Sequence, residues 1–560
     1  MENIKSKEQL IIPGLEEWRS EYSPKKIKRL ENSWAYTYRK YILPNLPIYK
    51  IVRHYTKGTG RPSLELYAMM GAIVLQQMYD LTDEQTKEDM AFNQLWHFAL
   101  DCYDEKNQVI SSKSIWTMRK YCLEEEVAAT VFSLVTDKLI KVLGIDTSKQ
   151  RLDSVHVHSN MQSIGRIRII FRAVTKFLKK LKKDYLDFYT LIMTDNLEDR
   201  YFKTGSDSIF GQVKPSETKK TLQILAEDAF ALLTRFQLED TITGLPSYKM
   251  LQRIFHEQCQ VDNDIVSLKK PQDVPSDSVQ NPSDPDAGYD GHKGKGYHDQ
   301  FLETFKTEEE RAEAEKSGIV KPDMITYVKT EPADIHDSHA LEPAIQNVIE
   351  RGLNCDKILA DAAYGGTKNT EMAEGYGVTL TAPTLGRTSE KGHKEFAFDF
   401  VTYEITSCSA GKKPDKITYN KQDSITAIWY QSTCAGCKLI ESCPTKSCTN
   451  GRKHYYTIDS IKCHFRREYE KSSEFKEEYR YRSGIEATNS RFISMTKARR
   501  SRYRGLEKMS FSQTLKALAV NMFRMSEFVA KLGFCVHKYV FLLIFGSYLC
   551  SKSEKIPNIA

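Results

Sequence analysis

Three carboxylates in this sequence stand where they could act on a phosphate ester. Asp361 follows the apolar residues of "KILADAAYGG", so we expect it at the end of a buried strand. Asp153 lies in "RLDSVHVHSN", whose period-two alternation predicts a second strand. Glu486 lies in "EEYRYRSGIEATNS", which predicts a helix. A buried carboxylate is unfavourable unless it is paired or binds a metal ion, so the three residues are candidates for one shared site.

The segment around Glu486 carries two more polar side chains at helical spacing. Tyr479, Arg482 and Glu486 are separated by three and then four residues, so they would share one face of a continuous helix. Taken alone, the pattern also fits a surface ion pair between Arg482 and Glu486. Together with Asp153 and Asp361, it favours a functional site.

A set of three carboxylates suits Mg²⁺ (or Mn²⁺). Mg²⁺ prefers carboxylate oxygens and retains water molecules for a substrate phosphate. Two such ions about 4 Å apart can clamp the attacking and leaving oxygens of an in-line phosphoryl transfer. The glycines after Asp361 would leave room for another backbone segment to approach.

Other polar residues are weaker candidates. His156 and His158 would point away from Asp153 on the same strand, so we expect them to pack rather than to bind a metal. Asp284 and Asp286 are typical of a turn before a strand. Possible substitutes for a member of the carboxylate set are Asp356, Glu477 and Glu478.

The elements expected around these residues form an α/β fold with added helical parts. Helical periodicity dominates the first part of the chain, and strands with an intervening helix follow. We expect a helical domain at 1–148, a sheet domain at 149–505 and a C-terminal helical tail at 506–560. Inside the sheet domain we expect a helical insertion at about 164–258, a flexible linker at about 260–295 and a cysteine-containing insertion at about 386–465.

Composition indicates a soluble chain of two or three domains with local basic regions. The 560 residues carry a net charge of +7, and two blocks are more basic than the rest. Residues 1–61 contain 13 Lys and Arg against 6 Asp and Glu, and residues 476–508 contain 10 against 4. Such blocks suit a polyanion, although a solvated surface is the alternative. The start of the chain lacks the pattern of a signal peptide, which favours the cytoplasm.

Two further segments bear on location and metal content. The apolar run at 539–550 is short for a membrane span, so we expect a buried terminal helix and no membrane contact. The chain has 12 cysteines, which in a cytoplasmic protein would be thiols or metal ligands. A structural Zn²⁺ site is one interpretation of Cys408, Cys434, Cys437 and Cys443, and reduced structural thiols are the other.

The chain resembles bacterial insertion-sequence DDE transposases, specifically the group numbered eleven eighty-two. The resemblance rests on several segments in the same order: "GRPSLELYAMMGAIVLQQMYDLTDEQTKEDMAFNQLWHFAL", "RLDSVHVHSN", "PSDPDAGY", "ADAAYGG", "YRYRSGIEATNSRF", "ARRSRYRGLEK" and "LKALAVNMFR". It implies an RNase H-like catalytic core, a mixed sheet flanked by helices. It also implies that Asp153, Asp361 and Glu486 form the metal-binding triad.

The same resemblance assigns roles to the residues near Glu486. Tyr479 and Arg482 belong to the motif around the glutamate. The guanidinium of Arg482 suits a phosphate contact, and Tyr479 could stack on a base or donate to the DNA backbone. The basic tract "KARRSRYRGLEK" is expected to contact DNA phosphates. Its basic residues are Lys497, Arg499, Arg500, Arg502 and Arg504.

The sequence departs from the family pattern at one position. Related transposases often carry a lysine seven residues after the glutamate, where this chain has Ile493. Lys497 would return to the face of Tyr479 if the helix ran that far, and Arg491 is the other basic candidate. Which basic residue takes the place of that lysine therefore stays open.

We therefore expect a transposase that binds terminal inverted repeats, cleaves the transposon ends and joins the 3′-hydroxyl to target DNA. The partners would be double-stranded DNA and further copies of the chain, in a homodimer or higher oligomer associated with the nucleoid. Two alternatives remain open. One is a metal-dependent nuclease without strand transfer, and the other is a catalytically inactive DNA-binding protein derived from a transposase.

Overall fold

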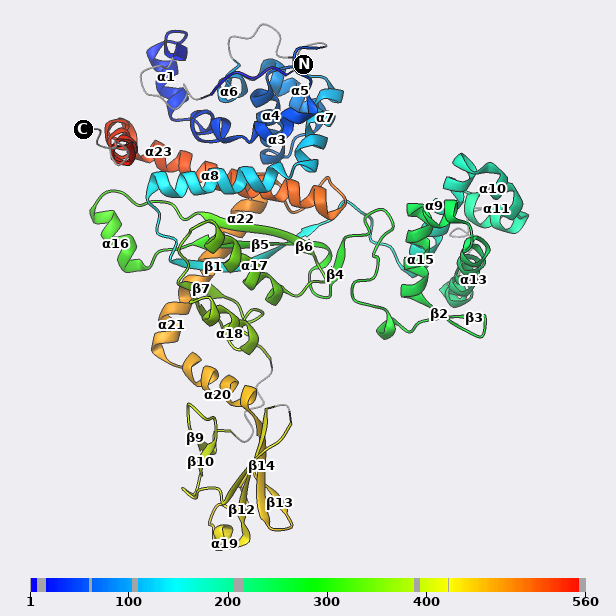
Figure 1. The fold of residues 1–560 in the computed structure, drawn as a ribbon, viewed down its shortest axis with the longest axis vertical. Coiled ribbons are helices and arrows are strands. Elements are labelled where there is room, and N and C mark those ends of the chain that lie inside the picture. Colours follow the sequence, from blue (N-terminus) through cyan, green and yellow to red (C-terminus); the bar gives the residue numbers. More distant parts are fainter. Residues whose placement is uncertain are drawn as a thin grey trace, which may run out of the picture.

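The structure is a computed structural model of the 560-residue chain. It describes residues 2–7, 17–59, 63–102, 109–204, 215–386, 393–421 and 423–552. Figure 1 shows a central sheet with helices above it, a helical unit to one side and a small β-rich unit at the far end. The mixed α/β fold expected from the sequence is present.

The first part of the chain is helical. Its α-helices are α1 (Pro24–Glu31), α2 (Trp34–Thr37), α3 (Ile48–Ile51), α4 (Leu66–Met78), α5 (Asp83–Phe92), α6 (Gln94–Ala99), α7 (Ser112–Glu124) and α8 (Val127–Leu143). Helix α4 is buried along nearly its whole length, and the carboxylate of Glu65 caps its first turn. Helix α8 ends at Gly144, which adopts the left-handed conformation that favours glycine.

The central sheet has six strands and mixed direction. They are β1 (Lys149–His158), β4 (Gly288–Asp290), β5 (Gly294–Thr304), β6 (Ile325–Pro332), β7 (Lys357–Ala360) and β8 (Thr379–Thr381). Strands β6, β5, β1, β7 and β8 lie side by side in that order, and β4 also pairs with β5. The β5–β6 and β5–β1 pairs are antiparallel, whereas β7 and β8 continue from β1 in parallel. The helices between these strands are α16 (Glu308–Lys316), α17 (Leu341–Glu350) and α18 (Thr367–Gly375).

In the sequence, a helical insertion lies between β1 and the other strands of the central sheet. It contains α9 (Arg166–Asp184), α10 (Leu186–Ile192), α11 (Asp195–Phe202), α13 (Thr218–Phe236), α14 (Asp240–Thr243) and α15 (Pro246–Gln258). Its apolar faces form a core of their own, and Figure 1 shows the unit beside the sheet. The segment expected as a flexible linker contains a hairpin of β2 (Cys259–Asp262) and β3 (Ile265–Leu268), followed by β4.

A second insertion, after β8, is built mainly of strands. It contains β9 (Phe396–Phe398), β10 (Ile405–Cys408), β11 (Lys416–Tyr419), β12 (Ser424–Tyr430), α19 (Gln431–Cys434), β13 (Lys446–Cys448) and β14 (Gly451–Thr457). Strands β11, β12, β14 and β13 form an antiparallel sheet in that order. Helix α20 (Ile458–Glu470) leads the chain back toward the central sheet (Figure 1).

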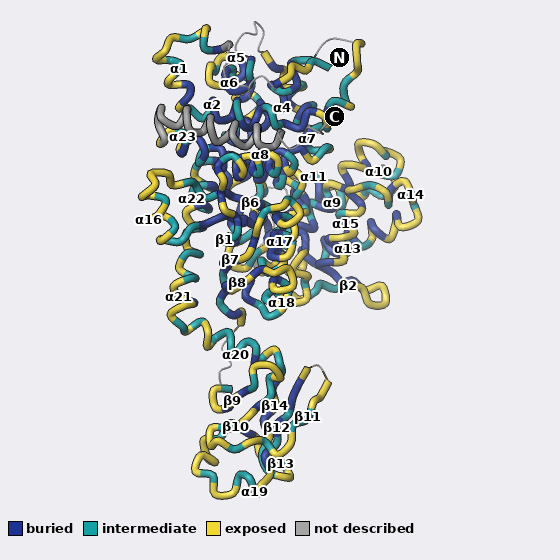
Figure 2. Tube along the Cα trace, turned by 60° about the vertical axis from the view of Figure 1, so that its left-hand side comes forward, coloured by how far each residue is buried: buried dark blue, intermediate teal, exposed yellow. Residues whose placement is uncertain are grey.

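The C-terminal helices return to the core. They are α21 (Ser473–Tyr479), α22 (Gly484–Thr496) and α23 (Leu506–Lys552). The first half of α23 packs into the same apolar core as α4 and α8. Figure 2 shows buried, dark-blue chain in this core around the labels α2 and α4. On α23, Asn521 bonds both backbone groups of Ile325, so it ties the helix to edge strand β6. The backbone of residues 539–550 is helical. The prediction that this helix is buried concerns side chains that lie outside the described part of the chain.

Candidate active site

The two aspartates lie side by side, Asp153 in the middle of β1 and Asp361 directly after the end of β7. Strands β1 and β7 are parallel, and Leu152 is paired with Ala360. Asp153 and Asp361 are the next residues on each strand, which explains why a carboxylate follows the apolar run of β7. The turn after Asp361 is tight, and a side chain on Gly365 would collide with the carbonyl oxygen of Pro383. The close backbone approach expected at these glycines is therefore present.

Arg482 joins the three predicted carboxylates. Its Nη1 atom lies 2.8 Å from Oε1 of Glu486, and its Nη2 atom lies 3.0 Å from Oδ1 of Asp153. The same Nη2 atom is 3.9 Å from Oδ2 of Asp361. Residues that are far apart in the sequence thus converge on one guanidinium. The site opens outward, because Asp153 is buried and Glu486 is exposed.

The helix that carries Glu486 is not continuous with the one that carries Tyr479. Helix α21 ends at Tyr479, a 3₁₀ turn follows at Arg480–Ser483, and α22 begins at Gly484. The prediction of one unbroken helical face is therefore wrong in detail, although Arg482 and Glu486 remain paired. A side chain on Gly484 would collide with the guanidinium of Arg151, so the chain needs a glycine where the two helices meet.

Tyr479 lies beside the carboxylates without bonding them. Its ring stacks on Phe475, with 5.3 Å between the ring centroids. Burial, together with the carboxylates of Asp361 and Asp153, raises the pKa of the Tyr479 phenol against the opposing effect of Arg482. The phenol therefore stays protonated near neutral pH and can donate a hydrogen bond.

Asn489 is a site residue that sequence reasoning missed. Its Nδ2 atom donates to Oδ2 of Asp153 at 3.0 Å, so both oxygens of this carboxylate have a partner from the C-terminal segment. Asn489 follows Glu486 by three residues on α22, which places both on one side of the helix. This three-residue spacing from Glu486 is the sequence feature that could have pointed to Asn489.

The surroundings of Asp153 disfavour the ionised form of its carboxyl group. Burial raises the pKa of Asp153 to about 6, and the carboxylates of Asp361 and Asp337 add to the effect. The guanidinium of Arg482 opposes it. Nearby negative charges make ionisation of a buried carboxyl less favourable, and a positive charge restores it.

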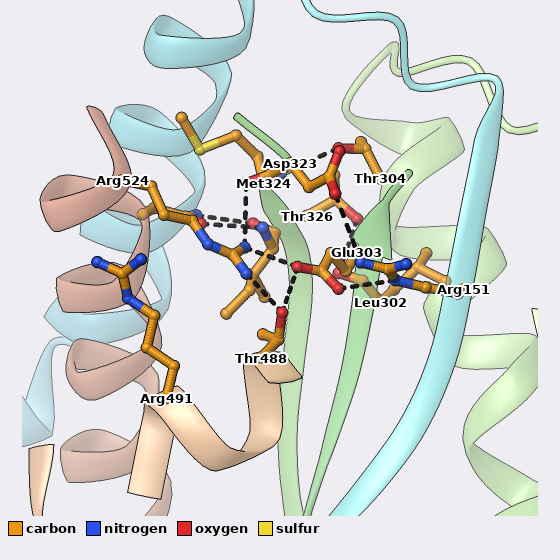
Figure 3. Close-up of polar contacts among 12 residues, drawn as sticks. Arg151, Leu302, Glu303, Thr304, Asp323, Met324, Thr326, Thr488, Arg491 and Arg524 are labelled. Atoms are coloured by element: carbon orange, nitrogen blue, oxygen red, sulfur yellow. Dashed lines mark hydrogen bonds and ion pairs between the residues drawn. The ribbon is translucent and has the colours of Figure 1, made fainter. Parts of the chain in front are cut away.

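A buried charge network holds the glutamate helix against the sheet (Figure 3). Glu303 on β5 is fully buried, and its carboxylate lies 2.9 Å from Nε of Arg151 and 2.7 Å from Nη1 of Arg524. Thr488 on α22 donates to the same carboxylate at 2.6 Å. Burial alone would raise the pKa of Glu303, but Arg524 and Arg151 outweigh it and lower the pKa.

The network connects the elements that carry the site. Arg151 lies two residues before Asp153 on β1, and Thr488 lies two residues after Glu486 on α22. Arg524 comes from α23 and also donates to the backbone oxygen of Asp323 at 3.0 Å. One buried carboxylate thus fixes two catalytic candidates relative to each other. No local sequence pattern predicts that these residues pair.

The basic tract after α22 lies along the end of β1. The backbone N–H of His158 donates to the carbonyl oxygen of Arg499 at 2.9 Å. Helix α22 ends at Thr496, so the helical route that would carry Lys497 back to the face of Tyr479 is absent. Lys497, Arg499 and Arg500 are exposed, and none of the three forms an ion pair with a carboxylate in the described part of the chain.

Two other arginines of the tract have protein partners. Arg502 Nε lies 3.0 Å from Oδ2 of Asp80, and Asp80 also pairs with the buried Lys516 on α23. Arg504 Nε donates to the carbonyl oxygen of Asn160. These contacts bind the tract to the N-terminal helices and to the end of β1.

The remaining polar candidates lie elsewhere. Asp356 is exposed at the opposite end of β7, and Glu477 and Glu478 form ion pairs with Arg480 and Lys357. His156 is buried on β1 directly opposite His298, which fits the expected packing role. Asp284 and Asp286 do more than form a turn, because they accept hydrogen bonds from the backbone N–H groups of Gly505 and Leu506 at the start of α23.

The four predicted zinc ligands lie at the tip of the β-rich insertion. Cys434 and Cys437 form a turn closed by the N–H of Cys437 on the carbonyl oxygen of Cys434 at 3.2 Å. Burial raises the pKa of Cys434, and the neighbouring thiols of Cys443, Cys408 and Cys437 raise it further. The other three thiols therefore lie near enough to Cys434 to affect its pKa.

Neither the three carboxylates nor the four cysteines are gathered closely enough to surround a metal ion. Throughout the described ranges, no three His, Cys, Asp or Glu side chains form a group arranged to hold a metal ion. At the carboxylates, the guanidinium of Arg482 lies among the oxygens instead. In the same ranges, no helix is long and apolar enough to span a membrane.

Two regions of the chain match known families of transposase domains. The family described as "Transposase DDE domain" matches residues 407–526, which include Arg482 and Glu486 but neither Asp153 nor Asp361. A second family, described as "Transposase domain (DUF772)", matches residues 26–121 of the helical N-terminal part. The chain is thus similar to transposases in two separate regions, and these similarities support an insertion-sequence transposase. No curated protein and no solved structure matches the chain.

Proposed function

We propose that the chain is a DNA transposase that binds terminal inverted repeats, cleaves the transposon ends and joins the 3′-hydroxyl to target DNA. The observation that carries this proposal is the meeting of Asp153, Asp361 and Glu486 around Arg482. Three carboxylates that converge on one cation can also hold the metal ions that assist phosphoryl transfer. The two transposase matches point to the same reaction class.

We propose that the central sheet is an RNase H-like core. Two features support this. The strand order β6–β5–β1–β7–β8 has antiparallel pairs on one side of β1 and parallel pairs on the other. The two aspartates stand at adjacent positions of β1 and β7, and the glutamate comes from a helix packed on β1.

Asp153, Asp361 and Glu486 would hold Mg²⁺ or Mn²⁺. The donor set fits, because all three groups offer carboxylate oxygens and already share one positive charge. When bound, the metal would supply stabilisation of the charge that develops on the transferred phosphate. Asn489 holds the orientation of Asp153, and Arg482 can turn its guanidinium fork from the carboxylates to a phosphate.

The DNA would contact more than one part of the chain. We propose that the N-terminal helical domain binds the inverted repeats and that Lys497, Arg499 and Arg500 contact phosphates near the carboxylates. Their exposure supports this role. A transposase must hold two DNA ends, so we propose a homodimer or higher oligomer on DNA, located in the cytoplasm with the nucleoid.

We also propose that Cys408, Cys434, Cys437 and Cys443 bind a structural Zn²⁺. The thiols are neighbours at one tip of the insertion, and their types suit tetrahedral zinc. They would have to draw together, because they form no closed group in this structure. Metal analysis of the purified chain and of Cys434→Ser with Cys437→Ser tests this. About one zinc per chain, lost in the variant, is expected, and a zinc-free wild-type chain contradicts it.

The catalytic proposal is tested by cleavage of a labelled duplex that carries the element's own end, with Mg²⁺ or Mn²⁺. Wild type should nick at the end and transfer it to a target duplex. Asp153→Asn, Asp361→Asn and Glu486→Gln should each lose cleavage, by a factor of about a thousand or more, while still shifting the duplex in a gel.

The chain offers matched controls for these carboxylates. Asp356→Asn and Glu477→Gln make the same chemical change at exposed positions away from Arg482, so they should cleave like wild type. A wild-type chain that cuts but never joins ends to a target would indicate a nuclease. A chain that binds the end and never cuts would be a transposase-derived binding protein.

A further inference from the structure

The sheet of the β-rich insertion has two faces in different environments. Its inner face is buried under the β9–β10 hairpin and α20. The buried residues on this face are Ile425, Ala427, Trp429, His454 and Tyr456. Residues at the alternate positions form the outer face. Its lysines and tyrosines are exposed, whereas Thr426 and Ile428 are partly buried and Ser424 is buried. Figure 1 shows this sheet at the lower end of the molecule, far from the N-terminal helices.

Three lysines lie in one row across this outer face. Lys416 on β11 is directly opposite Ile428 on β12, and Ile428 is directly opposite Lys453 on β14. Lys453 is in turn opposite Lys446 on β13. Because neighbouring strands are about 4.8 Å apart, the row spans all four strands in about 15 Å. All three lysines are exposed.

Aromatic and hydroxyl side chains lie on both sides of the lysine row. Tyr455 is opposite Thr426 in the next row, and 63% of its surface is exposed. On the other side, Tyr430 is opposite Gly451 and 41% exposed. The outer face thus combines ammonium groups with phenols and hydroxyls, all of which can donate hydrogen bonds to phosphate oxygens.

No negative charge offsets the row. The outer positions of the four strands carry no Asp or Glu, and within the described part of the chain the three lysines form no ion pair. The carboxylate of Asp415, which precedes Lys416, is bonded to the N–H of Tyr430 and the hydroxyl of Thr433. Like charges opposite each other on neighbouring strands, as at Lys446 and Lys453, destabilise a sheet unless an anion lies between them.

We propose that this lysine row (Lys416, Lys446 and Lys453) is a second DNA-binding surface, which holds the phosphate backbone of duplex DNA away from the carboxylates. The charge complementarity between an unpaired cationic row and a polyanion carries the proposal. It rests on the proposed transposase function and adds a contact to it. Lysine contacts to phosphate supply affinity and no base information, so the surface serves any sequence.

The test compares wild type with a triple variant, Lys416→Ala, Lys446→Ala and Lys453→Ala. The matched control removes the same charge from exposed lysines elsewhere: Lys249→Ala, Lys270→Ala and Lys316→Ala. Binding to a duplex of the element's end and to an unrelated duplex is measured by fluorescence anisotropy at several salt concentrations. Thermal melting confirms that each variant is folded.

The lysine-row variant should bind both duplexes about tenfold or more weakly at ~0.1 M salt. The slope of log affinity against log salt should shrink by about 2 to 3, since each lost phosphate contact removes about 0.9. The control should match wild type. A lysine-row variant with the affinity and slope of the control overturns the proposal.

The outcomes separate this inference from the proposed function. If wild type cleaves the end and the lysine-row variant binds like the control, only the inference fails. If wild type neither binds nor cleaves DNA, the proposed function fails and the inference with it. Lys453→Arg is a conservative variant that should keep most of the binding, because it keeps the charge.

Discussion

Arg482 places its Nη2 atom 3.0 Å from Oδ1 of Asp153, so an arginine is the counterion of the most buried carboxylate of the site. The same guanidinium serves Glu486 and approaches Asp361. A divalent cation bound by these carboxylates would take over that role. Arginine and metal are therefore expected to compete for the same oxygens.

Arg482→Ala should make stability depend on Mg²⁺. Without the guanidinium the three carboxylates repel one another, and we expect a loss of about 2 kcal/mol in the free energy of unfolding in EDTA. Mg²⁺ should restore most of this loss, because it supplies the missing charge. Urea denaturation with EDTA or with Mg²⁺ measures both values. Arg480→Ala, an arginine in the same turn with exposed partners, should show no such metal dependence. An equal loss for Arg482→Ala in EDTA and Mg²⁺ contradicts the competition.

Glu303→Gln should be strongly destabilising. The change leaves the buried Arg151 and the partly buried Arg524 close together without their shared carboxylate, and such losses amount to about 3–5 kcal/mol. Equilibrium unfolding in urea measures the effect. The control is Glu310→Gln, which removes a half-exposed ion pair with Lys149 and should change stability by less than about 1 kcal/mol. Similar effects for the two changes would show that the buried network contributes little.

Asp299 should make the protein less stable as the pH rises from about 4 to about 7. Burial raises the pKa of Asp299 from 3.8 to about 7, against the opposing effects of Thr330 and Lys516. The folded state therefore retains a proton that the unfolded chain has lost in this window, so unfolding becomes easier as the pH rises. Asp299→Asn carries no such proton. The variant should gain stability relative to wild type between pH 4 and 7, by a few kcal/mol at most (about 1.4 per pKa unit). Melting curves of both proteins across this range check it, and parallel pH profiles would rule it out.

The basic tract should divide into DNA-binding and structural arginines. Arg499→Ala with Arg500→Ala should weaken duplex binding and reduce its salt dependence by about 2, because both side chains are exposed and lack ion pairs in the described chain. Arg502→Ala should instead lower the melting temperature, since its guanidinium is bonded to the buried Asp80. Anisotropy titrations and melting curves on the same preparations separate the two. The division fails if Arg502→Ala weakens binding as much as the double variant does.

Local patterns were sufficient for the elements that carry the aspartates. Period-two alternation predicted the strand that contains Asp153, and the structure has β1 at Lys149–His158. The apolar run before Asp361 predicted the end of β7. Both strands are buried over most of their length, so a short apolar or alternating run without turn residues was a sufficient signal.

Relationships between distant residues could not be predicted in the same way. Nothing local distinguishes Glu303 from other polar residues of a strand, yet Arg151 and Arg524 make it the centre of a buried network. The 3₁₀ turn before Gly484 also escaped prediction, and its contacts come from another element: Arg151 of β1 donates to the carbonyl oxygen of Tyr481. Asn489 had a detectable spacing from Glu486, but its partner Asp153 lies far away in the sequence.

The positions of the three carboxylates along the sequence also determine when the site can form while the chain is being synthesised. Asp153 and Glu486 are separated by 486 − 153 = 333 residues. At about 5–20 residues per second, a ribosome needs roughly 17–70 s to reach the glutamate after the first aspartate. During that time at most two of the three carboxylates have been made, and the N-terminal helices still lack α23, which packs into the same core as α4 and α8. Chains that terminate before the glutamate would therefore lack both the complete carboxylate set and the last helix of the N-terminal core.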